Sequence, residues 1–143
     1  MSLYAAQTSV SEEASIEEIR QTLARYGADR VRVSYGGEQA SIGFRAHSRE
    51  VRLELTLPTR EECRRAPSGY RRTPAEWERA YEQAHRQCWR ALALVVKAKL
   101  EAVAVGIGAF DQEFLSSIVL ADDRTIGEVM VPQLGRVLAL PSP

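Results

Sequence analysis

The stretch that most constrains the fold is residues 74–105, which has the pattern of one long amphipathic helix. Pro74 suits the first helical position, where its missing N–H would be unpaired anyway, and Thr73 before it can cap the helix. At 100° per residue an apolar stripe occupies one side. Its members are Trp77, Tyr81, Ala84, Cys88, Leu92, Val95, Ala102 and Val103. We expect this stripe to face the core.

The opposite side of the same helix is basic, with members Arg79, Arg86, Arg90 and Lys97. A solvated face balanced by glutamates is the ordinary interpretation of such a ridge, and a phosphate-binding site is the alternative. Lys99 lies near the apolar side, so it must either extend out to solvent or find an acidic partner. If Asp111 or Glu113 holds it inward, Lys99 becomes a candidate ligand contact.

The 143 residues and 45% hydrophobic content predict a single domain with a packed core. Lys plus Arg equals Asp plus Glu at 19 each, so any attraction for nucleic acid must come from a local patch. Cys63 and Cys88 lack the spacing of a zinc or redox motif, which predicts free thiols. The N-terminal sequence does not resemble a signal peptide, and we expect a cytoplasmic protein.

A first helix is predicted over residues 15–27, preceded by residues 1–14 as a flexible segment or weak strand. Ser15 and Glu18 form a capping box, and Gly27 supplies the C-terminal stop. Residues 30–57 then alternate with period 2 in three runs, separated by Gly36-Gly37 and by His47-Ser48. This alternation predicts a three-stranded antiparallel meander with one apolar face.

The polar face of the predicted meander carries Arg30, Arg32, Arg45 and Arg52, interleaved with glutamates. Cross-strand ion pairing is one interpretation of this face, and a flat anion-binding surface is the other. The sequence does not decide between them, so Arg45 and Arg52 are secondary candidates for ligand binding.

Residues 58–73 join the sheet to the long helix and predict a mobile basic loop. Tyr70, Arg71 and Arg72 are candidate ligand contacts, with Arg64 and Arg65 as secondary ones. Arginine beside an aromatic ring suits a nucleotide or single-stranded nucleic acid, although a plain solvated linker has the same composition.

The rest of the chain predicts a bent helical hairpin over residues 74–120, whose second helix covers Phe110–Val119. Residues 125–143 form a short helix and a tail. Thr125 and Glu128 make the capping box of that helix, and Pro132 disturbs or ends it. The apolar tail either covers a groove, extends into a neighbouring subunit or forms an ordered end.

The common catalytic and phosphate-loop motifs do not occur, and the two histidines, His47 and His85, do not have the spacing of metal ligands. We therefore expect a protein without catalytic residues, metal or cofactor, and keep an unusual enzyme as an alternative. The fold class is α+β: an N-terminal helix, the meander, and the long helix in a bent hairpin with a shorter C-terminal helix.

Four blocks in this order and spacing resemble a family of small uncharacterised proteins encoded by bacteriophages and prophages: RYGADRVRV, IGFRAHSREVRLELTLP, CWRALALVVKAKLEAV and EFLSSIVLADDRTIGEVMVPQL. The resemblance covers Thr8 to Leu134. Its strongest block is Trp89 to Val103, in which Trp89, Arg90, Lys97 and Lys99 follow the family pattern. The family often has a longer tail after the last helix.

The phage setting implied by this resemblance favours a non-enzymatic protein that antagonises host defence in the bacterial cytoplasm. It would sequester a cyclic or other small nucleotide signal, or block a host defence protein. A nucleic-acid accessory protein of phage replication or recombination is the second hypothesis, and a small enzyme the third. We expect a homo-oligomer without membrane contact. The candidate ligand-binding residues are Tyr70, Arg71, Arg72, Trp89, Arg90, Lys97 and Lys99.

Overall fold

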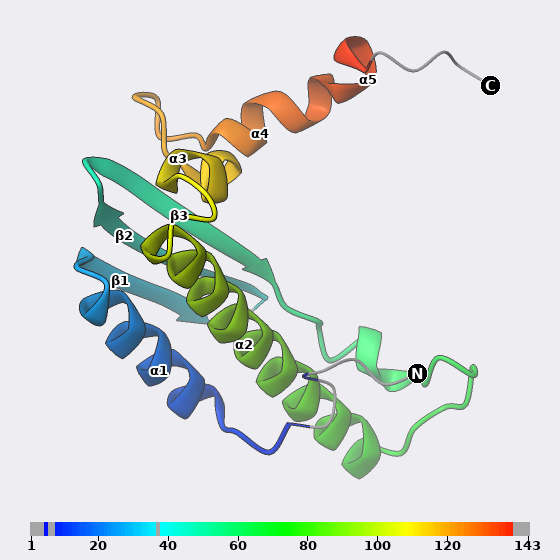
Figure 1. Cartoon of the computed structure of the whole chain (residues 1–143). Helices are drawn as coiled ribbons and strands as arrows, with labels where there is room; N and C mark the ends of the chain where they lie inside the picture. Colours follow the sequence, from blue (N-terminus) through cyan, green and yellow to red (C-terminus); the bar gives the residue numbers. More distant parts are fainter. Residues whose placement is uncertain (1–4, 6–7, 37, 139–143) are drawn as a thin grey trace.

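The computed structural model describes residues 5, 8–36 and 38–138. Its elements, with 3₁₀ helices labelled η, are α1 (Glu12–Arg25), β1 (Asp29–Gly36), β2 (Gln39–Ala46), β3 (Arg49–Thr56), η1 (Glu62–Arg64), α2 (Pro74–Ala104), α3 (Phe110–Glu113), η2 (Leu115–Ser117), α4 (Ile126–Met130), η3 (Val131–Gln133) and α5 (Leu134–Val137). The antiparallel sheet has the order β1-β2-β3, and α1 and α2 lie side by side on one of its faces (Figure 1). The predicted α+β class is confirmed.

The first helix begins earlier than its predicted start. Ser11 caps it by accepting a hydrogen bond from the Ala14 backbone at 3.1 Å, and Glu12 opens the first turn. Ser15, the predicted cap, lies buried within α1, and its Oγ has no hydrogen-bond partner in the described part of the chain. Two cap signals stand four residues apart here, and the earlier one adds a turn to the helix. Gly27 ends it as predicted, with a φ of +85° that glycine tolerates best. The predicted flexible segment or weak strand over 1–14 partly overlaps α1, and residues 1–4 and 6–7 lie outside the description.

The meander has the predicted alternation. Ala40, Ile42 and Phe44 of β2 are buried on the face that meets the helices. The second turn places both His47 and Ser48 in the left-handed region, at φ values of 50° and 61°, as a tight hairpin requires. The predicted first turn includes residue 37, which lies outside the described residues.

The long helix α2 begins at Pro74 as predicted, with Thr73 and Glu76 forming a capping box. Its buried face differs from the predicted stripe and consists of His85, Trp89, Leu92, Ala93, Val96 and Leu100. Of the predicted stripe, Leu92 is buried and Val95 is 44% exposed. The helix carries two apolar arcs, and the wheel alone does not say which one the sheet and α1 cover. They cover the arc that contains the large Trp89 side chain.

The segment predicted as one helix over Phe110–Val119 divides into α3, η2 and a short extended piece. Ile118 forms an antiparallel bridge with Val51, and the Val119 N–H donates to the carbonyl of Glu50 at 2.8 Å. Two consecutive β-branched residues favour this extended conformation over a helix. The chain thereby covers part of the free edge of β3.

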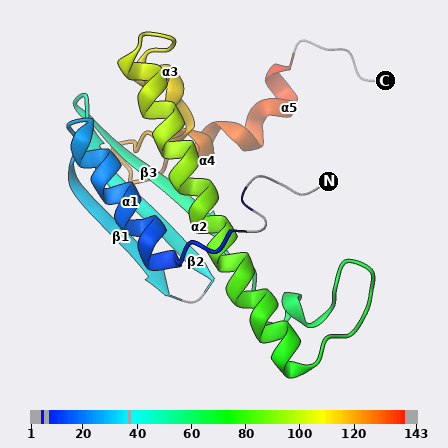
Figure 2. The ribbon, with the colours of Figure 1, turned by 60° about the horizontal axis from the view of Figure 1, so that its bottom comes forward.

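The last helices match their sequence signals. Thr125 caps α4 by accepting a hydrogen bond from the Glu128 backbone at 3.1 Å, and α4 ends before Pro132, which lies in η3. From α4 to α5 the chain projects away from the sheet and α2 (Figures 1 and 2). The end of the predicted tail, residues 139–143, lies outside the description.

The core is contained between the sheet and the helices. Phe44 packs edge-on against Phe114 with ring centroids 5.7 Å apart, and Phe110 stacks on Phe114 at 4.7 Å. Trp89 of α2 is 1% exposed and meets the Tyr35 ring edge-on at 6.3 Å. Among the residues described, no helix is both long and apolar enough to cross a membrane.

Candidate functional site

The basic loop between β3 and α2 is folded rather than structureless. Residues 62–64 form η1, and Arg65 bridges Arg71 in antiparallel fashion. The Ala66 N–H donates to the carbonyl of Tyr70, and the Arg72 N–H donates to that of Arg64, both at 2.8 Å. These backbone bonds close a small hairpin, a feature that composition alone does not reveal.

Beside this hairpin lies a depression of about 310 Å³ at the first turn of α2, lined by Arg64, Arg71, Arg72, Pro74 and Trp77. We call these five residues the arginine cleft. The Arg64 guanidinium lies 5.9 Å from the centroid of the Trp77 ring. Three cations therefore surround a site with an aromatic wall, and each comes from the loop that the sequence singled out.

The arginines of the cleft differ in how they are held. Arg72 donates to the carbonyls of Cys63 at 3.0 Å and Arg65 at 3.4 Å, which fixes its guanidinium beside the loop backbone. Arg64 pairs with Glu61 at 3.0 Å. Within the described chain, neither Arg71 nor Arg72 has a carboxylate partner. Residues 60–72 contain five arginines and two glutamates, so the loop carries a formal charge of +3.

Tyr70 stands next to the cleft and is 57% exposed. Its hydroxyl donates to Glu76 at 3.2 Å, and this hydrogen bond raises the pKa of the phenol. Glu76 in turn accepts from the backbone of Thr73, and that bond is the main reason why the pKa of this carboxyl is lowered. The Tyr70 ring is thus held at the start of α2 with much of its surface in solvent.

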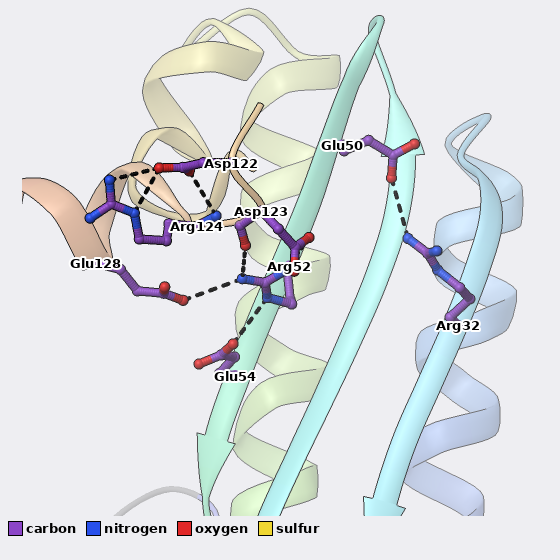
Figure 3. Close-up of polar contacts among 8 residues, drawn as sticks. All are labelled: Arg32, Glu50, Arg52, Glu54, Asp122, Asp123, Arg124 and Glu128. Carbon is purple, nitrogen blue, oxygen red and sulfur yellow. Dashed lines mark hydrogen bonds and ion pairs between the residues drawn. The ribbon is translucent and has the colours of Figure 1, made fainter. Parts of the chain in front are cut away.

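A second arginine-rich region lies on the sheet face away from α1 and α2, and we call it the outer sheet face. It has a hollow of about 490 Å³ lined partly by Arg30, Arg32, Glu50, Arg52 and Asp123. Arg30 and Arg32 share Glu50, at 4.0 and 3.3 Å. Figure 3 shows the contact of Arg32. To reach Glu50 on β3, the Arg32 side chain crosses β2 at Gly43, where a Cβ would lie 3.5 Å from its guanidinium.

Arg52 is the centre of the ion pairs on this face. It contacts the carboxylates of Glu54 at 3.0 Å, Asp123 at 3.3 Å and Glu128 at 3.4 Å (Figure 3). Partial burial opposes the charged form of Arg52, but the hydrogen bonds to Glu128 and Glu54 outweigh it and raise the pKa. Arg30, Arg32 and Arg52 thus meet four carboxylates, so the outer sheet face has no surplus of positive charge.

The other predicted ligand residues lie apart from the cleft. Trp89 is in the core, Arg90 pairs with Glu18 of α1, and Lys97 is exposed. Lys99 donates to the backbone carbonyl of Glu113 at 2.7 Å, so the predicted inward partner is a carbonyl and not a carboxylate. Lys97 follows the cleft residue Trp77 by 20 residues, and this separation along α2 corresponds to about 30 Å. The structure therefore brings together Arg64, Tyr70, Arg71 and Arg72, with Arg65 beside them, and separates the rest, including the exposed Arg45.

Sequence reasoning missed Trp77 as a cleft residue because the helical wheel assigned it to the core-facing stripe. Its position in the first turn, directly after the arginine loop, was the available signal. His85 is 8% exposed, and its ring nitrogens lie 3.1 Å from Glu12 and from the carbonyl of Pro58. It ties α1, α2 and the exit of β3 together.

Neither protein-family models, nor curated proteins, nor solved structures give a match to this chain. The resemblance to phage-encoded proteins remains a prediction.

Proposed function

We propose that this chain is a non-enzymatic binding protein whose arginine cleft holds a phosphate-bearing ligand, with a small or cyclic nucleotide as the first candidate. The observation that carries the proposal is the surplus of arginine around one depression with an indole wall. Guanidinium groups bind phosphate oxygens through paired charge-assisted hydrogen bonds, and an indole or phenol ring stacks on a base.

In the phage setting that the resemblance implies, such binding would remove a nucleotide immune signal from the host. This hypothesis requires the ligand to be held and released intact. A direct block of a host defence protein stays a prediction of the same setting, and the cleft chemistry favours the nucleotide.

Single-stranded nucleic acid is the second candidate, and one arrangement favours it. Arg60 lies 4.3 Å from the centroid of the Tyr81 ring, one helical turn beyond the pair formed by Arg64 and Trp77. Two arginine–aromatic pairs in a row offer stacking positions for successive bases. Such a track would contact several phosphates and bind less tightly as salt increases.

Calorimetry with cyclic dinucleotides, cyclic trinucleotides and an oligothymidylate, at about 50 and about 200 mM salt, tests both candidates. Saturable binding of a cyclic nucleotide, followed by recovery of the intact compound, is the result expected for a sequestering protein. Preferential binding of longer oligothymidylates with a steep salt dependence would replace it with the second candidate. Absence of binding by all three probes would contradict the proposal.

A further inference from the structure

Exposed apolar side chains are concentrated in the C-terminal part of the chain. Three of the twelve exposed large hydrophobic residues that the structure describes, Tyr35, Tyr70 and Val95, lie before residue 100, and the other nine lie between Val105 and Leu138. Residues 126–138, which we call the arm, contribute five of the nine: Met130, Val131, Leu134, Val137 and Leu138, which are 43–62% exposed.

The direction of the arm is set by a close backbone contact. A Cβ on Gly127 would lie 2.8 Å from the Ser116 carbonyl oxygen, so glycine lets α4 lie directly against η2. Beyond this anchor, Gln133 turns its side-chain amide back onto the carbonyl of Val129 at 2.9 Å. The Gln133 amide thus has its hydrogen-bond partner within the arm, while the apolar side chains of the arm are exposed. Helical segments of this length are marginal alone in water.

The long helix has a second apolar surface that the described residues leave largely exposed. Ala91, Val95, Ala98, Ala102 and Val105 follow one another at spacings of 4, 3, 4 and 3 residues, the repeat of a helix that packs on another helix. We call these five residues the outer stripe. Val95 is 44% exposed and Val105 61%, and Ala91 and Ala98 are also exposed.

The arm and the outer stripe have the size that a dimer interface needs. The seven larger side chains retain roughly 50 Å² of apolar surface each and the three alanines roughly half as much, since 1.5–3 kcal/mol per large apolar side chain at about 25 cal/mol per Å² corresponds to roughly 60–120 Å². Because interfaces are roughly 60% apolar, this total of about 420 Å² corresponds to a contact of about 700 Å² per partner, within the range of specific complexes. One chain thus supplies both halves of a complementary pair.

We propose that two copies of the chain associate reciprocally, each placing its arm over the outer stripe of the other. An isologous arrangement of this kind uses both surfaces twice and closes after two copies. It is independent of the arginine cleft, which lies at the opposite end of α2 from Val105.

Sedimentation velocity of the full chain at about 100 µM tests this association, because standard-size interfaces commonly reach micromolar or tighter Kd. The expected particle has twice the 15.9 kDa of one chain. Leu134→Glu in the arm and Val95→Lys in the outer stripe should each give a monomer with an unchanged circular-dichroism spectrum. Ala98→Glu replaces Val95→Lys if the latter does not fold. The matched control is Leu115→Glu, also at an exposed apolar position (52%) but outside both surfaces, which should leave the dimer intact.

Mixing the Leu134→Glu and Val95→Lys variants distinguishes arm-to-stripe contacts from other pairings. In the mixed dimer one contact is entirely wild-type. The other places the glutamate introduced in one arm against the lysine introduced in the partner's outer stripe, so dimers should reappear. A wild-type monomer at this concentration, with or without a different protein bound to the arm, would overturn the proposal. So would a dimer that neither substitution disrupts, or a mixture that stays monomeric.

Discussion

On the outer sheet face, Arg32 and Arg52 are held by carboxylates, whereas in the arginine cleft Arg71 and Arg72 have no ion pair within the described chain. The sheet places acidic side chains on neighbouring strands, where regular spacing brings opposite charges together. The loop concentrates five arginines in 13 residues with only two glutamates. In the described structure Arg60 pairs with Glu78 of α2 and Arg64 with Glu61, and no other arginine of the loop has a carboxylate partner. Arginine number is thus a poor guide to an anion site, and the balance of nearby carboxylates is a better one.

The largest expected difference between the two regions is in ligand binding. Replacing Arg64 and Arg71 together by alanine should weaken nucleotide binding about 100-fold or more, since each hydrogen bond to a charged group contributes about 1.5–3 kcal/mol. Calorimetry provides the measurement. Stability should change little, because Arg71 forms no ion pair in the described structure and the pair between Arg64 and Glu61 is exposed. The control is Arg32→Gln on the outer sheet face, which should bind the nucleotide as the wild type does. An equal loss of nucleotide affinity in both variants would contradict the difference between the two regions.

Trp77→Leu should weaken binding by about tenfold, because stacking on a base contributes roughly 1–3 kcal/mol. In the wild type, quenching of tryptophan fluorescence on ligand addition should come from Trp77, since Trp89 is buried. Ligand-dependent quenching that persists in Trp77→Leu would place the base elsewhere.

Arg52→Gln should have the opposite effect to the cleft variants: a loss of about 1–2 kcal/mol in the free energy of unfolding and no change in ligand binding. The substitution leaves Glu54, Asp123 and Glu128 close together without their shared cation, and half-exposed networks of this kind are modest in strength. Urea unfolding checks the stability. An Arg52→Gln variant that is as stable as the wild type but defective in ligand binding would indicate that the ligand binds on the outer sheet face.

The smallest effect concerns pH at the start of α2. The pKa of Glu76 is lowered below its ordinary value of 4.5, so its contribution to stability is present above pH 4.5 and disappears as pH falls through the lower folded value. Glu76→Gln should flatten this part of the stability profile, measured by urea unfolding from about pH 6 to about pH 3. Identical profiles for the two proteins would contradict a role for the carboxylate in the cap.

The elements with strong local signals could be predicted from the sequence. Alternation identified all three strands, and Thr73-Pro74 and Thr125 marked two helix starts. The start of α1 was misplaced because Ser11 and Ser15 are both good caps. The extended pair Ile118-Val119 was missed because its conformation depends on the edge of β3, which no local pattern reveals.

The candidate site was only partly predictable for a similar reason. Tyr70, Arg71 and Arg72 are neighbours in sequence, so the loop composition identified them. Arg90 depends on Glu18, more than 70 residues away, and its pairing appears only after α1 docks on α2. The packing of the sheet and α1 likewise decides which apolar arc of α2 is buried. As a result Trp89 lies in the core and Trp77 lines the cleft.

The most direct test of the cleft is an NMR titration that follows the arginine Nε–H and tryptophan indole signals while cyclic di-adenylate or a short oligothymidylate is added. The account predicts that the signals of Arg64, Arg71, Arg72 and Trp77 shift with a common saturation curve, while those of Arg32 and Arg52 stay in place. Shifts confined to Arg32 and Arg52, or no shifts with either ligand, would contradict it.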